Sequence, residues 1–512
     1  MTVFIGGRNL TTEDFRQIVF HRSEVEIDKA ALEAVRENFL FLESFSKNKI
    51  IYGINTGLGP MSQYKVQEKD RIALQYNLIR SHAAGTGRPI EDIHITALMT
   101  ARLNMLMQGY SGVHPSVVLL LKDFINNDIL PIIPRHGGVG ASGDLVQLAH
   151  LALALIGEGE VKYKGQRLDT LIALQDAGLE PIHMHIREAL ALINGTSAMS
   201  GIGIINVIYA NQLLGWAIAA SALINEVVES YDDHFSRELN RVKLHPGQAE
   251  ITEKMLKILA SSQLTRKRAD DLFNGTNGEM VFSKKIQEYY SIRCITQILG
   301  PINDTIRQAE TVVLNEINSV NDNPVIDHKT HNVYHGGNFH GDYVALEMDK
   351  LKIAVTKLSM LAERQLNFVM NNRLNGLLPP FVNLGALGLN LGMQGAQFTA
   401  TSTVAENQTL SFPSYIHSIS TNNDNQDIVS MGTNAALQAC QVIENSYEVM
   451  SIHLLTLIQA VDYLKIEDRL SDFTQDIYRD LRAIVPAFEH DRYMSPELGK
   501  IKEYLLQNPI SI

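Results

Sequence analysis

The segment at residues 137–144 has the residue types and spacing that most directly suggest chemistry, because it reads Gly-Gly-Val-Gly-Ala-Ser-Gly-Asp. Its glycines match G-x-G-x-x-G, the pattern of a dinucleotide-binding turn, which requires a buried strand before it. The preceding run carries Pro131 and Pro134, which cannot donate hydrogen bonds within a central strand. No alternating strand–helix pattern follows, so the sequence disfavours a nucleotide site. A purely structural tight turn remains an alternative.

The Ala141-Ser142-Gly143 tripeptide within this segment could instead build an electrophile from the chain itself. The amide nitrogen of Gly143 can attack the carbonyl carbon of Ala141 and close a five-membered ring, since glycine has no Cβ in the way. Loss of water, including the Ser142 hydroxyl, leaves 4-methylidene-imidazol-5-one (MIO), which no ordinary side chain can replace. Asp144 follows directly and is a candidate to handle protons during these dehydrations.

At this tripeptide the chain resembles the aromatic amino acid ammonia-lyase family, whose prosthetic group arises from the same three residues. Further segments resemble the family in the same order along the chain: Tyr52-Gly53-Ile54-Asn55-Thr56-Gly57, Asn77-Leu78 with Ser81-His82, Ala191-Leu192-Ile193-Asn194-Gly195-Thr196, Tyr290-Ser291-Ile292-Arg293, Asn321-Asp322-Asn323-Pro324, Gly336-Gly337-Asn338-Phe339-His340 and Asn425-Gln426-Asp427. The resemblance implies an all-α, fumarase/aspartase-like architecture, an MIO group, and a homotetramer whose active sites draw on three subunits.

The resemblance also assigns roles to single residues, most of which have an ordinary structural reading as well. Tyr52 matches the catalytic base that removes a β-proton, so nearby cations or dipoles must stabilise its phenolate. Tyr290 matches an assisting tyrosine, and Arg293 matches the guanidinium that clamps the substrate carboxylate through two parallel hydrogen bonds. Asn194 matches an asparagine that bonds the ring oxygen, although an Asn before Gly can also simply cap a turn. Phe339 resembles a residue packed near the substrate.

Two positions bear on which aromatic amino acid is the substrate. Ser81-His82 follows the pattern of histidine-specific members, whereas Asn425-Gln426 follows that of tyrosine- and phenylalanine-specific members, which lack the glutamate that pairs with imidazole. A neutral Gln426 offers no charge compensation, while His82 can hydrogen-bond a phenol hydroxyl. We therefore predict L-tyrosine as substrate and 4-coumarate as product, a combination that certain bacterial tyrosine ammonia-lyases share. Histidine elimination, phenylalanine elimination and a tyrosine 2,3-aminomutase activity remain open.

Other ligand classes are disfavoured by the residues that the sequence lacks. The histidines cluster in two places: His331, His335 and His340, and His183 with His185. The spacing of four between His331 and His335 would suit zinc only on one helix face, and Gly336-Gly337 makes a helix there unfavourable. His183 and His185 are two apart and would point to different faces of a helix. Cys294 and Cys440 lie far apart, which argues against a zinc ribbon or disulfide framework and suits a reducing cytoplasm. The net charge of −12 disfavours a nucleic-acid partner. We expect no signal peptide, because the start of the sequence has no basic region followed by an apolar run and a small-residue cleavage site. We expect no membrane span, because the apolar stretches break at charges.

The elements that must position these residues are predicted to be helices. Glycine-rich loops alternate with short helices near the N-terminus, at 29–45, 69–80 and 93–108, and a β-hairpin is expected at 161–163 with 166–168. Gaps without Gly or Pro indicate later helices: one at 342–375, two within 433–485, and a helical stretch at 204–245 interrupted only by Gly215. Leu346, Leu351, Val355, Leu358, Ala362 and Leu366 form the expected apolar stripe of the first gap. We therefore divide the chain into a loop-rich active-site region, 1–200, and a helical bundle, 201–512.

Overall fold

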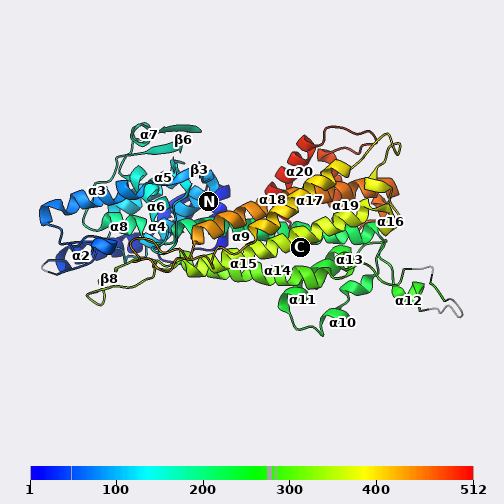
Figure 1. Cartoon of the computed structure of the whole chain (residues 1–512), viewed down its shortest axis with the longest axis horizontal. Coiled ribbons are helices and arrows are strands. Elements are labelled where there is room, and N and C mark those ends of the chain that lie inside the picture. Colours follow the sequence, from blue (N-terminus) through cyan, green and yellow to red (C-terminus); the bar gives the residue numbers. More distant parts are fainter. Residues whose placement is uncertain (1, 48, 274–279, 283–284, 511) are drawn as a thin grey trace. The chain divides into compact units, whose positions relative to one another are not determined.

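The chain folds mainly into helices, which make up 59% of the computed structural model (Figure 1). The residues that the structure describes are 2–47, 49–273, 280–282, 285–510 and 512. Strands in this described part are short and pair in small sheets of two or three. The predicted all-α class is therefore confirmed.

The chain forms two compact units, each built from three stretches of sequence. The first unit comprises Met1–Ile208, Gln308–Asp349 and Pro413–Cys440. The second comprises Tyr209–Arg307, Lys350–Phe412 and Gln441–Ile512. The chain thus returns to the first unit twice, and the division at residue 200 that the loops suggested stays a prediction.

The first unit contains the predicted N-terminal helices close to their expected bounds. Its main helices are α2 (Lys29–Phe45), α3 (Arg71–His82), α4 (Asp92–Leu106), α5 (Pro115–Asn126), α6 (Leu145–Leu155) and α8 (Glu188–Ile193). The side chain of Asp28 caps α2 by accepting from the Ala31 amide, and Pro115 occupies the first position of α5, where no N–H is needed. Helix α4 is buried on all sides from Ala97 to Leu106 and forms the centre of this unit.

The first unit also contains small antiparallel sheets, one of which directly precedes the glycine-rich segment. The predicted hairpin forms as β6 (Glu160–Tyr163) and β7 (Gln166–Asp169), paired antiparallel. Strand β5 (Pro134–His136) precedes the segment and pairs antiparallel with β3 (Thr86–Pro89). Because this sheet has two strands and no parallel neighbour, the described residues lack the central strand that a dinucleotide-binding turn requires.

The long Gly- and Pro-free gaps contain helices, as expected. The longest helices are α9 (Ser197–Val227), α14 (Ile295–Ile317), α15 (Asp342–Met370) and α18 (Gly432–Leu464). The gap 433–485 holds two long helices, α18 and α19 (Asp472–Ile484), and α15 is followed at Asn371 by the short α16 (Asn372–Asn375).

The predicted stripe of α15 is correct except at Leu346, whose side chain is 41% exposed. The other five members are buried, with exposed fractions of 5% or less. The step from Leu346 to Leu351 is five residues, which rotates by about 140° around the helix and leaves the buried face. Val344, Ala345 and Met348 face the interior in its place.

The helical stretch predicted for 204–245 was too long, because α9 ends at Val227. Glu229 adopts a left-handed conformation with φ of 47°, and its amide donates to the Glu226 carbonyl. The Ser230 amide donates to the Asn225 carbonyl, which completes a Schellman cap. The left-handed position of such a cap is usually glycine. Because Glu229 occupies it here, the sequence did not predict that the helix ends at this point.

Helix α9 also corrects the statement that apolar stretches break at charges. It carries no charged residue before Glu226, and it is long and apolar enough to cross a membrane. However, 83% of its most apolar window is buried within the fold, as in the core helix of a globular protein. Its polar side chains are also bonded internally: Asn206 donates to the Ala436 carbonyl and Gln212 to the Leu505 carbonyl.

Candidate active site

The Ala141-Ser142-Gly143 tripeptide forms a tight turn directly before α6. A backbone bridge joins Gly140 to Gly143, so the chain folds back on itself at the two residues between them. Gly143 has a φ of +71°, and a Cβ there would lie 2.0 Å from the Gly195 carbonyl oxygen. Only glycine fits this position, and because glycine has no Cβ, no side chain beside its amide nitrogen obstructs cyclisation. The residues present therefore fit an internally formed ring.

Segments that are distant in sequence hold this turn by backbone hydrogen bonds. The Gly341 amide donates to the Gly140 carbonyl at 3.0 Å, and the Met431 amide donates to the Val139 carbonyl at 3.0 Å. After the turn, the Asp144 amide donates to the Gly195 carbonyl at 2.7 Å. The turn is thus fixed from three sides within the first unit.

Asn194 lies beside the tripeptide, at the point where the chain leaves α8. Its backbone has extended angles, φ −86° and ψ 126°, and its side-chain Nδ2 donates to the Ser142 carbonyl oxygen at 3.1 Å. In the cyclised tripeptide this oxygen would be the ring carbonyl. The amide therefore has the position of an oxyanion-hole donor, which is the role that the resemblance implied.

Gln426 contacts the other oxygen of the same serine. Its Nε2 donates to Ser142 Oγ at 2.8 Å, from a loop in which Asn422, Asn423 and Asp424 have φ between 52° and 57°. Three successive left-handed residues are rare and cost conformational energy, a pattern that clusters at functional sites. The neighbouring Asn425 is exposed, and its amide donates to the Asn422 carbonyl.

Asp144 is a fully buried carboxyl group next to the tripeptide. Burial raises its pKa to about 6, although hydrogen bonds from Thr433 Oγ1 and from the Met199 amide, at 2.8 Å, work in the opposite direction. A carboxyl that titrates near pH 6 can both accept and return a proton near neutrality. This is the property that the dehydrations would require.

Tyr52 lies in a loop that is held in place by two buried isoleucines close to it in sequence. Ile51 and Ile54 are buried in one cluster with Leu42 of α2 and Ile326 of β8 (Val325–Asp327). The Gly59 amide donates to the Tyr52 phenol oxygen at 3.0 Å. A donor aimed at this oxygen would stabilise negative charge on it, as a tyrosine base needs.

His82 is the last residue of α3, and its contacts fix its tautomer. Its Nδ1 lies 3.0 Å from the Leu78 carbonyl oxygen, which can only accept, so Nδ1 carries the proton. In the neutral ring, Nε2 is then an acceptor. Ser81 Oγ lies 3.0 Å from the same Nδ1. His82 therefore offers one acceptor nitrogen, Nε2, to a ligand.

Phe339 also belongs to the first unit and is half-buried. It stands two residues before Gly341, whose amide bonds the tripeptide turn at Gly140, so backbone connectivity keeps this segment near the turn.

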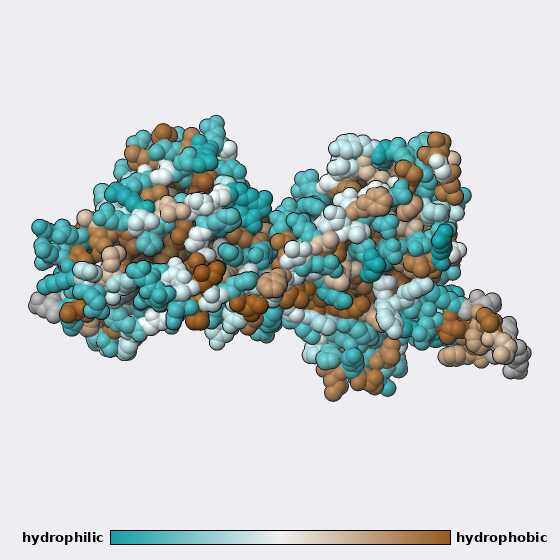
Figure 2. Space-filling view, in the orientation of Figure 1, coloured by the Kyte–Doolittle hydropathy of each residue, from teal (hydrophilic) through white to brown (hydrophobic). Residues whose placement is uncertain are grey.

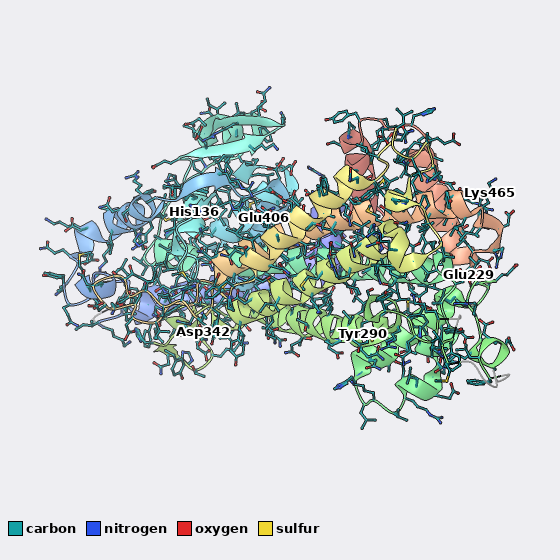
Figure 3. The ribbon with its side chains drawn as sticks, turned by 45° about the vertical axis from the view of Figure 1, so that its right-hand side comes forward. His136, Glu229, Tyr290, Asp342, Glu406 and Lys465 are labelled. Atoms are coloured by element: carbon teal, nitrogen blue, oxygen red, sulfur yellow. The ribbon has the colours of Figure 1, made fainter. Side chains whose placement is uncertain are left out.

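Tyr290 and Arg293 belong to the second unit, on the one-turn helix α13 (Tyr290–Arg293). The Tyr290 side chain, labelled in Figure 3, is 70% exposed. The Arg293 guanidinium lies 4.8 Å from the centre of its ring, in a cation–π contact. The structure therefore brings Asn194 and Gln426 onto Ser142, whereas Tyr290 and Arg293 form a separate pair.

The histidine clusters do not gather into a metal site within the described residues, where no group of three His, Cys, Asp or Glu could hold an ion. His331 and His335 are exposed, and His185 stacks on His114 at 4.7 Å between ring centres.

One residue at this site was not singled out from the sequence. Arg102 of α4 is fully buried and donates through Nη2 to the carbonyl oxygens of Ala191 and Asn194, the latter at 2.8 Å. The only signal was a cation in the middle of a helix whose neighbouring residues are mostly apolar.

Comparison with known proteins identifies the family to which the chain is similar. The profile described as aromatic amino acid lyase matches residues 10–483. A tyrosine 2,3-aminomutase of Myxococcus sp. (strain Mx-B0) is 39% identical, covering 96% of this chain and 95% of its own length. A histidine ammonia-lyase of Geobacillus thermodenitrificans (strain NG80-2) is 37% identical, covering 99% of this chain and 98% of its own.

A solved structure of tyrosine aminomutase from Streptomyces globisporus superposes with a TM-score of 0.95 at 35% identity, over 99% of this chain and 97% of that one. The implied fumarase/aspartase-like architecture is thereby confirmed. The chain is an enzyme of the aromatic amino acid lyase family.

Proposed function

We propose that this enzyme eliminates ammonia from L-tyrosine to give 4-coumarate, using an MIO group formed from Ala141-Ser142-Gly143. In this reaction the bond between the α-carbon and nitrogen breaks, a β-proton leaves, and the carbons form a double bond. The observation that carries the proposal is the convergence of Asn194 and Gln426 on the two oxygens of Ser142, in a turn where position 143 accepts only glycine.

In this proposal the MIO group supplies an electrophilic carbon that activates the substrate for loss of ammonia. Tyr52 removes the β-proton, and the Gly59 amide stabilises charge on its oxygen. Asn194 donates to the Ser142 carbonyl oxygen, where negative charge would accumulate. Arg293 binds the carboxylate and Tyr290 assists, while Phe339 packs near the aromatic ring.

The preference for tyrosine rests on His82 and Gln426. His82 has Nε2 available to accept from a phenol O–H, since its Nδ1 proton is committed to the Leu78 carbonyl. Gln426 is neutral and offers no compensation to a protonated imidazole. A site that bonds a hydroxyl rejects the analogue without it, by about 10⁴-fold in favourable cases.

The test combines intact mass with a substrate panel. The purified chain should be lighter than its sequence mass by two waters, and Ser142→Ala should remain folded but lose the methylidene and turnover. Rates of ammonia release are then compared for tyrosine, phenylalanine and histidine. A full-length unmodified mass with normal turnover would exclude MIO, and a wide preference for histidine would exclude the substrate assignment.

A second activity, tyrosine 2,3-aminomutation, is favoured by the names of three relatives that are 38–40% identical. In that case ammonia returns to the β-carbon, so the product is an isomer of the substrate. Chiral chromatography of a reaction with tyrosine distinguishes the two outcomes, because only the aminomutase accumulates β-tyrosine beside 4-coumarate.

We also propose a homotetramer in which subunits share active sites, in a reducing cytoplasm to which the two free cysteines are suited. Apolar surface on the second unit supports association: Figure 2 shows a brown area at the lower edge of the segment around α10 (Arg237–Asn240), where Val242 and Leu244 are 75% and 90% exposed. Sedimentation velocity measures the assembly, and a fully active monomer would contradict it.

A further inference from the structure

Arg102 is a buried cation whose contacts all lie at one end of a short helix. It stands in the middle of α4, with no exposed surface, and its Nη2 donates to the carbonyl oxygens of Ala191 and Asn194. Helix α8 ends at Ile193, so these are among the last carbonyls of that helix. Such carbonyls have no partner within their own helix and carry partial negative charge. A guanidinium is therefore well suited to cap them.

The same guanidinium also packs against the next residue, Gly195. A Cβ at Gly195 would lie 2.6 Å from Arg102 Nη1 and 2.5 Å from Asn321 Oδ1. Gly195 in turn accepts the Asp144 amide through its carbonyl oxygen. Arg102 thus limits where Asn194 and Gly195 can lie, and both of these residues bond the tripeptide segment directly.

The cap is expensive, which indicates that it serves more than packing. Arg102 makes no ion pair within the described part of the chain, and its Nε and Nη1 have no hydrogen-bond partner there. Burial lowers the pKa of Arg102 to about 10, so the side chain is still charged at neutral pH. The nearby carboxylate of Asp322 is already paired with Arg187. An apolar side chain would fill this place at lower cost.

We infer that Arg102 is a positioning residue of the active site: it caps the end of α8 and thereby aims the Asn194 amide at the Ser142 carbonyl oxygen. Its hydrogen bonds go to the carbonyls of Ala191 and Asn194 and not to the tripeptide. The catalytic part of this inference rests on the proposed function, whereas the capping part does not.

The first test measures capping without reference to activity. Amide hydrogen exchange over residues 188–196 is compared among the full-length wild type, Arg102→Met and Arg102→Lys. Asn104→Ala is the matched control, because Asn104 is buried in the same helix but donates to the Ile317 carbonyl. We expect faster exchange at 188–196 in Arg102→Met, a smaller change in Arg102→Lys, and none in the control. Unchanged protection in both Arg102 variants would overturn the inference.

The second test asks whether Arg102 acts through Asn194. Turnover per dehydrated chain should fall by at least ~10-fold in Arg102→Met, with KM changed by less than ~3-fold, because loss of one oxyanion donor typically costs 10²–10³ in kcat. In an Asn194→Ala background the same substitution should change kcat by less than ~2-fold. Equal factors in both backgrounds would show a merely structural role and overturn the inference.

Two controls keep these outcomes distinct. If Arg102→Met does not fold, Arg102→Lys carries the same cycle, since it retains the charge but donates in a different geometry. If the wild type has an unmodified mass and releases no ammonia, the proposed function fails, while the exchange experiment still decides the capping of α8.

Discussion

Gly143→Ala is the substitution whose effect the structure predicts most specifically, because an added Cβ has no room at this position. The new Cβ would lie 2.0 Å from the Gly195 carbonyl oxygen, whereas ordinary contacts begin at 3.4 Å, so the backbone must move by about 1.4 Å (3.4 − 2.0). Gly165 supplies the matched control, because it has a similar φ, +76° against +71°, and nothing within 4 Å of an added Cβ. Both substitutions carry the left-handed backbone cost of about 1–2 kcal/mol. Only Gly143→Ala also creates a clash with the Gly195 carbonyl oxygen and displaces the hydrogen bond from the Asp144 amide to that oxygen. Loss of this hydrogen bond adds about 0.5–1.5 kcal/mol to the destabilisation.

We therefore expect Gly165→Ala to lose about 1–2 kcal/mol of stability and to keep its turnover and its two-water mass deficit. Gly143→Ala should lose about 2–4 kcal/mol and show little or no dehydration, because the displaced amide no longer meets the Ala141 carbonyl. Urea unfolding, intact mass and near-ultraviolet absorbance measure the three quantities. A two-water deficit in Gly143→Ala, with turnover within ~3-fold of Gly165→Ala, would refute the geometric argument.

Three further outcomes are expected. Burial raises the pKa of Asp144 from 3.8 to about 6, so the folded chain holds a proton that the unfolded chain has released over this range. The stability of the wild type relative to Asp144→Asn should therefore fall by about 3 kcal/mol (1.36 × 2.2) as the pH rises from about 3 to about 7, and a flat difference in urea unfolding would contradict this. His82→Phe should lower the ratio of kcat/KM for tyrosine over phenylalanine by ~10- to 100-fold, because it removes the acceptor nitrogen, and an unchanged ratio in steady-state assays would dismiss that role. Inactive Tyr52→Phe and Arg293→Ala chains should regain activity when refolded together if sites are shared, whereas mixtures that stay inactive would argue against sharing.

Helices were predictable from the sequence where a local signal marks their limits. The gaps without Gly or Pro predicted the starts of α15 and α18 to within one residue, since these two residue types are the strongest helix breakers. They did not predict the end of α15 at Met370 or the end of α18 at Leu464. The end of α9 was missed because Glu229, rather than glycine, adopts the left-handed cap conformation. Packing in the tertiary structure enforces that conformation, and no local pattern records it. Likewise, Leu346 is apolar but faces outward, because helix rotation sets its direction.

For the site as well, features set by local sequence could be predicted, whereas features set by long-range contacts could not. The tripeptide is a local pattern with a chemical meaning, so the turn at 141–143 could be predicted from the sequence alone. The convergence of Asn194 and Gln426 on one serine depends on contacts across 52 and 284 residues. The family resemblance suggested that Asn194 lies beside the ring, but it placed Gln426 at the substrate and not on the serine. Arg102 had neither kind of signal, since a single arginine within a helix has no pattern of its own.

Buried charged side chains lie at both ends of helix α8, which leads directly to Asn194. A helix of six residues is too short to be stable alone, so its position must come from contacts at its ends. At its start, Arg187 pairs with Asp322, and Glu188, whose pKa burial raises to about 7, accepts the backbone amides of His114 and His185. At its end, Arg102 holds the last carbonyls. Each of these groups is costly to bury, yet together they fix the direction in which the chain leaves α8, and that direction determines whether the next side chain meets the Ser142 oxygen.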